Sequence, residues 1–461
     1  MSDSGLIPLD PTTATGIEDR LKILRSSLKV QVPYTSGVLP VKAEDLVVYY
    51  DTDDEKNARQ IDFGSATVED LVALTAACQQ ATFGVNQEDV LDESYRKAGK
   101  MDPTKFAARL DVVASGLIDA ISPDILEGQN AEGEKVLKAE MYKLNVYGPG
   151  SFFKAHKDTP RGETMIGSLV VVFPTAHEGG TLTLEHGGST WAFESATMLA
   201  DPTPAALKVA YVAFYSDVTH AVEPVTAGSR VTLTYNLYLA EHPTHAASAH
   251  RIPPAPERTF EETLRALLAD PVFLPAGGLL GYGLAHQYPI PSEPIFNPDG
   301  TMKSSRIGYV LKLLKGVDAR VRTVSERVGL ETHVKVLYDS GDYYEPGHDV
   351  LADDVLELEK VNEAYDDVRD HMEQLGVILK RGAGPARENP EERRRRAGNE
   401  EDERERTGQE VHWVTKISDL NRVGSEYLAY GNDASLKHMY GDAALFVRVP
   451  SFGEGIRSAL Q

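Results

Sequence analysis

The spacing of apolar residues predicts helices in the first part of the chain. Within residues 16–28 and again within 103–121, apolar side chains recur at every third or fourth position, the spacing of an amphipathic helix. Thr67 precedes another such run and predicts a capped helix start. We therefore expect residues 16–134 to form a mostly helical N-terminal support region that follows a flexible tail at residues 1–15.

From residue 135 to 241 the pattern changes to short runs rich in β-branched and aromatic residues, separated by Gly, Pro and Asp. Such runs are typical of β-strands. A succession of strands without helices between them favours a β-sandwich or a jelly-roll barrel. The predicted strands are 136–147, 168–173, 179–186, 189–193, 209–215 and 230–239.

The second half of the chain has a mixed pattern. Residues 242–259, rich in Pro, Ala and His, indicate a linker to a C-terminal domain at 260–461. That domain contains strand-like runs and also helical spacing over 260–268 and 353–376. Residues 382–410 combine dense mixed charge with no aromatic residue and no aliphatic residue larger than alanine, which predicts a disordered insertion. The predicted fold class is α+β, with a mixed α/β C-terminal domain of unknown role.

Composition narrows the classes of function. Lys and Arg number 47 against 70 Asp and Glu, a net charge of −23, and an acidic surface disfavours extended contact with nucleic acid. The single cysteine, Cys78, excludes an intramolecular disulfide and fits a reducing compartment. The sequence shows neither a secretory signal pattern nor an apolar run of the ~20 residues that span a membrane. We expect a cytoplasmic or nuclear protein without membrane association.

The candidate chemistry is concentrated between Tyr142 and Pro160, where His156 and Asp158 stand two residues apart. On a strand, residues i and i+2 project from the same face, so an imidazole and a carboxylate can meet at one metal ion. His220 follows another predicted strand and is the third candidate ligand. Two His and one carboxylate form the facial triad of non-haem Fe(II) oxygenases. Zinc is the competing metal, but the chain has no His-Glu-x-x-His motif.

Arg230 begins the predicted strand after His220, in a run otherwise made of Val, Leu and Tyr. A buried guanidinium needs an anionic partner, and it can hold a carboxylate through two parallel hydrogen bonds. An exposed Arg without a role is the alternative interpretation. This alternative is less favoured when Arg230 is considered together with the three candidate metal ligands.

In this order, residues 142–239 resemble the prolyl 4-hydroxylase-type Fe(II)/2-oxoglutarate dioxygenases. The family pattern is a Tyr on a strand, a Gly, His-x-Asp, a Gly pair, a distal His, and then a Lys or Arg. The matching residues are Tyr147, Gly150, His156, Asp158, Gly179, Gly180, His220 and Arg230. Many relatives carry Thr two positions after the Gly pair. This chain has Leu182 there, between Thr181 and Thr183, and strand alternation leaves open which of these faces the pocket.

The resemblance implies a double-stranded β-helix core in which His156, Asp158 and His220 bind Fe(II). It further implies that Arg230 anchors 2-oxoglutarate, that Tyr147 hydrogen-bonds this cosubstrate, and that dioxygen is the oxidant. The implied activity is that of an oxidoreductase that hydroxylates a substrate C–H bond, most directly in a prolyl residue of a protein or peptide, with release of succinate and CO2.

Several alternatives stay open at this point. The same chemistry on a small metabolite or a nucleobase is one, and a non-enzymatic binding scaffold is another. Two-domain fungal prolyl hydroxylases pair a catalytic barrel with a second, metal-free one, and this chain is similar in layout. The sequence indicates neither the oligomeric state nor a role as an oxygen sensor.

Overall fold

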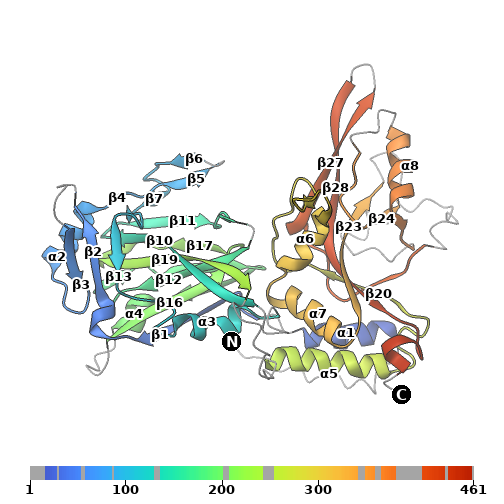
Figure 1. Cartoon of the computed structure of the whole chain (residues 1–461), viewed down its shortest axis with the longest axis horizontal. Helices are drawn as coiled ribbons and strands as arrows, with labels where there is room; N and C mark the ends of the chain where they lie inside the picture. The colour runs from blue at the N-terminus through green and yellow to red at the C-terminus, as the bar shows by residue number, and fades with distance from the viewer. Residues whose placement is uncertain are drawn as a thin grey trace. The chain divides into compact units, whose positions relative to one another are not determined.

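A computed structural model describes residues 16–28, 31–52, 58–85, 88–128, 135–162, 164–200, 207–241, 254–340, 348–358, 365–380, 408–430 and 434–458. The chain divides into two compact units (Figure 1). Residues 32–248 form one, which we call the β-helix unit, and residues 1–31 with 249–461 form the other, the mixed unit. The predicted tail at 1–15 and most of the predicted insertion at 382–410 lie outside the described residues.

Two antiparallel sheets build the β-helix unit. The larger sheet has the order β1 (Tyr34–Pro40), β16 (Lys208–Tyr215), β12 (Met165–Val172), β19 (Arg230–Glu241), β10 (Lys135–Tyr147), β8 (Gly99–Met101) and β4 (Gln79–Gln80). The smaller sheet has the order β15 (Ser189–Phe193), β14 (Leu182–His186), β17 (Thr219–Val222), β11 (Phe152–His156) and β7 (Arg96–Lys97). Each run predicted as a strand between residues 136 and 239 overlaps one of these strands, which confirms the jelly-roll prediction.

Burial of β12 explains the apolar pattern of its sequence. Strand β12 lies between β16 and β19, and nearly all of its side chains are buried. It therefore reads as a continuous apolar run rather than an alternating one. Helix α3 (Leu117–Ile125) packs against β1, β10 and β16, with Leu117 and Ile121 fully buried. Strand β10 pairs with β19 along its whole length, so that Tyr147 stands opposite Arg230.

The prediction that residues 16–134 are mostly helical is wrong. Helices α1 (Ile17–Ser27), α2 (Val68–Ala77) and α3 are present, but strands account for much of the remainder. Besides β1, β4, β7 and β8 these are β2 (Val47–Asp51), β3 (Ala58–Asp62), β5 (Phe83–Val85), β6 (Glu88–Val90) and β9 (Phe106–Ala108). Helix α1 belongs to the mixed unit.

The helix predicted over residues 103–121 shows the physical reason. Phe106 is buried where β9 pairs with β2. The Asp111 carboxylate then accepts the backbone N–H groups of Val113 and Ala114, which makes a turn. Gly116, with φ of +80°, leads into α3. The apolar residues face one core, but a strand, a turn and a short helix present them, and periodicity alone does not distinguish these.

The mixed unit contains one large sheet with helices packed against it (Figure 1). The order is β25 (Val377–Ile378), β24 (Asp349–Ala352), β23 (Glu331–Asp339), β28 (Ala434–Val449), β20 (Gly278–Gly283) and β26 (Val411–Trp413), and β27 (Arg422–Tyr430) also pairs with β28. Strand β20 runs parallel to β26 and antiparallel to β28. The helices are α1, α5 (Ala255–Ala269), α6 (Arg306–Leu313), α7 (Gly316–Arg327) and α8 (Tyr365–Leu375).

These elements confirm the prediction of a mixed α/β C-terminal domain. Helix α5 covers the helix predicted over 260–268, although it begins inside the predicted linker, whose residues 242–253 lie outside the described chain. Helix α8 covers the end of the helix predicted over 353–376. The described part of this unit has one large sheet rather than two facing ones, so the similarity in layout to two-domain fungal enzymes stays a prediction.

Smaller elements complete the described chain. Strand β13 (His177–Gly179) pairs with β18 (Val225–Gly228), β21 (Ile295–Phe296) pairs with β22 (Met302–Ser304), and α4 (Ser195–Leu199) follows β15. Short 3-10 turns occur at Ala43–Leu46, Asp419–Asn421 and Gly455–Ser458. Among the described residues, no helix combines the length and apolar character needed to cross a membrane.

Candidate metal centre

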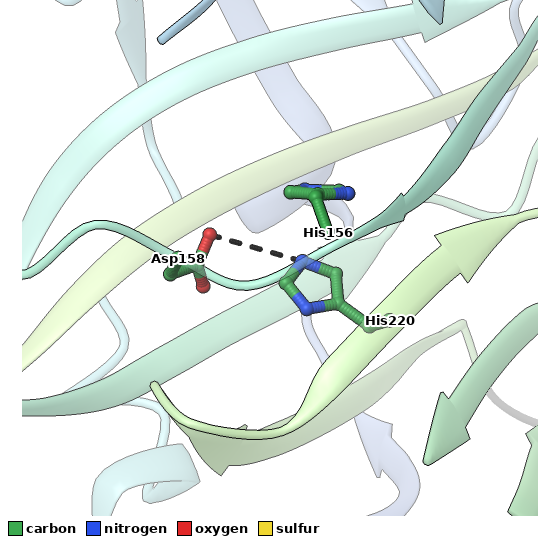
Figure 2. Close-up of side chains that lie close together, drawn as sticks. All are labelled: His156, Asp158 and His220. Carbon is green, nitrogen blue, oxygen red and sulfur yellow. Dashed lines mark ion pairs between the residues drawn. The ribbon is translucent and has the colours of Figure 1, made fainter. Parts of the chain in front are cut away.

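The smaller sheet brings the two predicted histidine ligands together. His156 is the last residue of β11, His220 lies on β17, and the two residues are register partners. Asp158 follows two residues after the end of β11. One side-chain ligand atom from each of the three residues lies within 4.8 Å of the others (Figure 2). The geometry suits coordination of a single ion by all three side chains.

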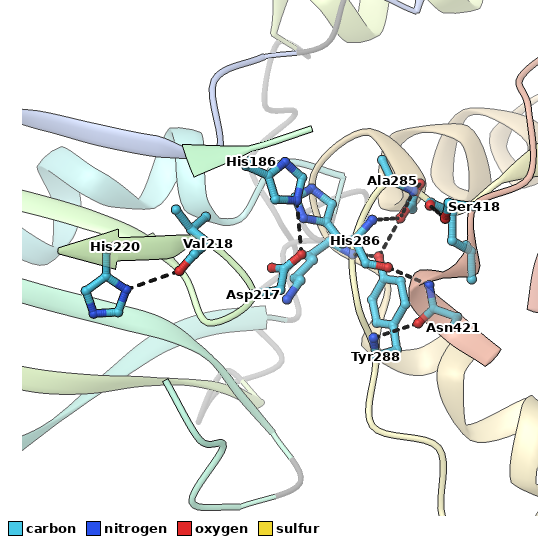
Figure 3. A network of polar contacts seen from close by, with 12 residues as sticks. His186, Asp217, Val218, His220, Ala285, His286, Tyr288, Ser418 and Asn421 are labelled. Atoms are coloured by element: carbon cyan, nitrogen blue, oxygen red, sulfur yellow. Dashed lines mark hydrogen bonds and ion pairs between the residues drawn. The ribbon is translucent and has the colours of Figure 1, made fainter. Parts of the chain in front are cut away.

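Hydrogen bonds to the backbone set the tautomer of both rings. Nδ1 of His156 lies 2.8 Å from the carbonyl oxygen of Lys154. Nδ1 of His220 lies 3.1 Å from the carbonyl oxygen of Val218 (Figure 3). A carbonyl oxygen only accepts, so each Nδ1 carries the hydrogen and each Nε2 presents a lone pair. This is the arrangement in which a histidine is ready to bind a metal.

The carboxylate is oriented by a hydroxyl from the larger sheet. Ser168 Oγ on β12 donates to Asp158 Oδ2 at 2.5 Å. Asp158 Oδ1 lies 3.7 Å from His220 Nε2, so Oδ1 is the carboxylate oxygen that faces His220. A hydrogen bond to one oxygen of a ligating carboxylate fixes which oxygen meets the metal.

Burial keeps the His156 ring neutral. Desolvation, followed by the nearby His220, lowers the pKa of His156 to about 3. The ring stacks on Phe153 with centroids 3.6 Å apart. At neutral pH the ring is therefore unprotonated, the form that binds metal.

Arg230, the first residue of β19, is 1% exposed. Its Cζ lies 5.6 Å from the centre of the Tyr147 ring. Burial lowers the pKa of this guanidinium to about 10, so it stays charged at neutral pH. Its Nη2 is buried without a hydrogen-bond partner among the described residues. A charged donor left in this state is costly unless an anion binds it, and a carboxylate fits that donor.

A chain of hydrogen bonds supports the Arg230 side chain through its Nε atom. His177 Nδ1 lies 2.8 Å from the carbonyl oxygen of Thr175, which makes His177 Nε2 an acceptor. Ser195 Oγ lies 3.0 Å from this Nε2 and donates to it. The Ser195 oxygen then accepts from Arg230 Nε at 3.4 Å. Sequence reasoning missed this support because a Ser after a strand carries no distinctive pattern.

Close packing explains the glycine pair. A Cβ on Gly180 would lie 2.9 Å from Arg230 Cδ and 2.8 Å from Val225 Cγ2, and Gly180 has φ of +66°. A Cβ on Gly179 would lie 2.4 Å from the carbonyl oxygen of Pro224. Both positions therefore need glycine, and the one at Gly180 does so because the buried guanidinium passes beside it.

One cavity of about 180 Å³ joins these residues, because His156, Asp158, His220, Tyr147 and Arg230 all line it. Leu182 lines it too, which settles the orientation that the sequence left open. The hydroxyl of Thr183 instead lies 3.5 Å from the carbonyl oxygen of Ala221. The leucine therefore occupies the place on the wall where many relatives have threonine.

Comparison with known proteins defines the class. Residues 142–238 match the model of the 2OG-Fe(II) oxygenase superfamily. The matched segment contains the three candidate ligands and runs from within β10 to within β19. Residues 142–238 are therefore similar to a 2OG-Fe(II) oxygenase domain, and the two sheets of this unit form a double-stranded β-helix core. No curated protein sequence matches the chain.

Solved structures of the same class show distant similarity. A Pseudomonas putida prolyl-4-hydroxylase is 17% identical over 47% of this chain and 98% of its own, with a TM-score of 0.28. A Trichoplax adhaerens prolyl hydroxylase, solved with a hypoxia inducible factor peptide fragment, is 15% identical over 37% and 76%, with a TM-score of 0.25. A collagen prolyl hydroxylase from Paramecium Bursaria Chlorella virus-1 is 12% identical over 32% and 80%, with a TM-score of 0.21.

Proposed function

We propose that the β-helix unit is an Fe(II)- and 2-oxoglutarate-dependent dioxygenase that hydroxylates a prolyl residue of a protein or peptide. The convergence of His156, Asp158 and His220 carries the reaction class, because two imidazoles and one carboxylate on one ion would leave coordination positions open for other ligands. The choice of a prolyl substrate follows from the resemblance of the ordered motif between Tyr142 and Leu239.

The residues present fit both groups that this chemistry needs. The Nε2 atoms of His156 and His220 and a carboxylate oxygen of Asp158 would hold Fe(II). The unpartnered Nη2 of Arg230 would bind the distal carboxylate of 2-oxoglutarate, with Tyr147 beside it. Bound Fe(II) and 2-oxoglutarate would supply the oxidising chemistry, in which one oxygen atom of dioxygen ends in the hydroxylated substrate and the other in succinate, with release of CO2.

The protein supplies orientation and a cavity with a partly apolar wall. Ser168 and the two backbone carbonyls fix the ligand atoms before the metal arrives, which lowers the cost of binding. Leu182, Val170 and Phe214 line the cavity with apolar surface. An apolar wall strengthens the electrostatic contacts inside and limits side reactions with water.

Succinate formation tests this proposal. The purified full chain should release succinate from 2-oxoglutarate only when ferrous iron is present, and His156→Ala and Asp158→Ala should abolish this release. His333→Ala is the matched control, because His333 lies on β23 of the mixed unit with a half-exposed side chain. Release that persists in both triad variants would overturn the assignment. A proline-containing peptide library read by a mass gain of one oxygen tests the substrate.

A further inference from the structure

The cavity differs in charge from the protein that contains it. The whole chain carries a net charge of −23. Among the described residues that line the cavity, Asp158 is the one carboxylate, and it faces the candidate metal. The cationic residues of the lining are Arg96, Lys143, Lys157, Arg161 and Arg230. The proposed function uses only Arg230, so the cationic lining exceeds what iron and 2-oxoglutarate require.

Arg96 is buried and is held by several contacts. It lies on β7 and is 8% exposed. Its Nη1 donates to the carbonyl oxygen of Thr82 at 2.7 Å, and its Nη2 donates to Asn145 Oδ1 at 2.8 Å. Its Cζ lies 4.3 Å from the centre of the Phe153 ring. These contacts fix the guanidinium plane, yet Nε remains buried without a hydrogen-bond partner among the described residues.

Strand β10 places this donor relative to the cosubstrate end of the cavity. Lys143, Asn145 and Tyr147 alternate along β10, and all three line the cavity. Tyr147 is the register partner of Arg230 on β19, whereas the Asn145 side chain accepts a hydrogen bond from Arg96. Two residues of a strand span about 7 Å. The Arg96 guanidinium therefore lies about one such step along β10 from the position proposed for 2-oxoglutarate.

A carboxylate is the ligand that this position fits. A buried, charged N–H without an acceptor is costly, and an oxyanion satisfies it with a charge-assisted hydrogen bond. The cavity of about 180 Å³ must hold the cosubstrate as well as this second ligand. The limited space favours a small anionic group, which is a carboxylate. We propose that Arg96 binds a carboxylate of the substrate, so that the enzyme prefers substrates with an acidic group close to the hydroxylated carbon. This inference rests on the proposed dioxygenase function.

A purely positioning role for Arg96 makes a different prediction. Arg96 packs on Phe153, and Phe153 stacks on His156. If Arg96 served only to hold this stack, its substitution would weaken metal binding and leave the preference among substrates unchanged. The experiment therefore measures metal binding and substrate preference separately.

The test compares wild type with Arg96→Gln and Lys97→Gln. Lys97 is the next residue on β7, is exposed, and loses the same charge. Each protein is loaded with Mn(II) and 2-oxoglutarate, which permits binding without turnover. The probes are blocked pentapeptides with a central proline and one Asp at each other position, the matching Asn peptides, and free N-acetylaspartate against N-acetylasparagine. Binding is measured by calorimetry.

We expect wild type and Lys97→Gln to bind an Asp probe at least about tenfold more tightly than its Asn partner, the range of a hydrogen bond to a charged group. In Arg96→Gln this ratio should fall to about one while the Mn(II) and 2-oxoglutarate affinities stay unchanged. Preference seen only among peptides identifies a peptide substrate, and preference seen only with the free acid identifies a small molecule.

Equal binding of Asp and Asn probes by wild type would overturn the inference, as would a ratio that survives Arg96→Gln or a loss of Mn(II) affinity in that variant. Arg96→Lys, which keeps the charge but loses the planar fork, replaces Arg96→Gln if the latter does not fold, and its ratio should fall below that of wild type. Wild type that binds neither Mn(II) nor 2-oxoglutarate would instead overturn the proposed function itself.

Discussion

At the scale of single residues, the site depends both on the side chains that line it and on one position where a side chain is absent. Gly180 lacks a side chain where Arg230 passes, and the guanidinium keeps its position because no Cβ displaces it. The identities of Arg230 and the three candidate ligands could be predicted from their order along the chain. Ser168, Ser195 and Arg96 could not, because their roles come from strands that meet only in the folded protein.

Gly180→Ala should weaken 2-oxoglutarate binding. The added methyl would lie within 3 Å of Arg230 Cδ, and φ of +66° adds a backbone penalty of about 1 kcal/mol for a residue with a side chain. Gly187→Ala is the matched control, because Gly187 has φ of +55° with nothing within 4 Å of its Cβ position. Both variants should unfold at lower temperature than wild type. Only Gly180→Ala should lose the thermal stabilisation that 2-oxoglutarate adds to the Mn(II) protein, and equal losses in both would contradict this.

At the scale of elements, strand prediction succeeded where burial on both faces or steady alternation left one interpretation. Strands β10, β12 and β19 are examples, with residues such as Leu169 and Leu233 fully buried between neighbouring elements. Prediction failed over residues 103–121, where the Asp111 turn and the pairing of β9 with β2 override helical spacing. It also failed to place α1, because membership of a unit depends on contacts far away in the sequence.

One such contact joins α1 to the end of α5. Arg20 Nε donates to Asp270 Oδ2 at 2.6 Å, and Asp270 Oδ1 accepts the backbone N–H of Val272. Burial alone would raise the pKa of Asp270, but these bonds outweigh it and hold the pKa below its usual value. A lowered carboxyl pKa contributes stability above the unfolded pKa of about 3.9, and this contribution disappears as the pH falls through the folded value.

Asp270→Asn should therefore destabilise the mixed unit by about 1 kcal/mol or less at pH 7, the range of a partly exposed ion pair. The difference from wild type should shrink as the pH falls below about 4. Denaturant unfolding followed by Trp413 fluorescence measures this, with Trp191→Phe as the common background because the chain has 2 Trp residues. A difference that is the same at pH 7 and pH 3 would show that the charge of Asp270 is not responsible.

At the scale of the whole molecule, the proposal assigns the chemistry to the β-helix unit alone. All described residues that line the cavity come from the β-helix unit. The charged lining could not be predicted from the sequence, since the net charge of −23 describes the surface as a whole and not one internal wall. Trp191, on β15, reports on the unit that contains the cavity.

Mn(II) with 2-oxoglutarate should raise the unfolding midpoint reported by Trp191 in a Trp413→Phe background. A ligand at one hundred times its dissociation constant stabilises the folded state by about 2.7 kcal/mol. His156→Ala should abolish the shift, and His333→Ala should leave it intact. A midpoint that does not move with saturating Mn(II) would show that the three side chains do not form a metal site.

The contrast between an acidic exterior and a cationic interior has a kinetic consequence. 2-Oxoglutarate is a dianion, and a chain with a net charge of −23 repels it at long range. Dissolved salt screens charges separated by more than about 10 Å at 0.1 M, while the contact with a buried guanidinium is screened much less. Moderate ionic strength should therefore increase the rate at which 2-oxoglutarate binds without weakening its binding once bound. An enzyme that attracts its ligand electrostatically from a distance shows the opposite dependence of the binding rate.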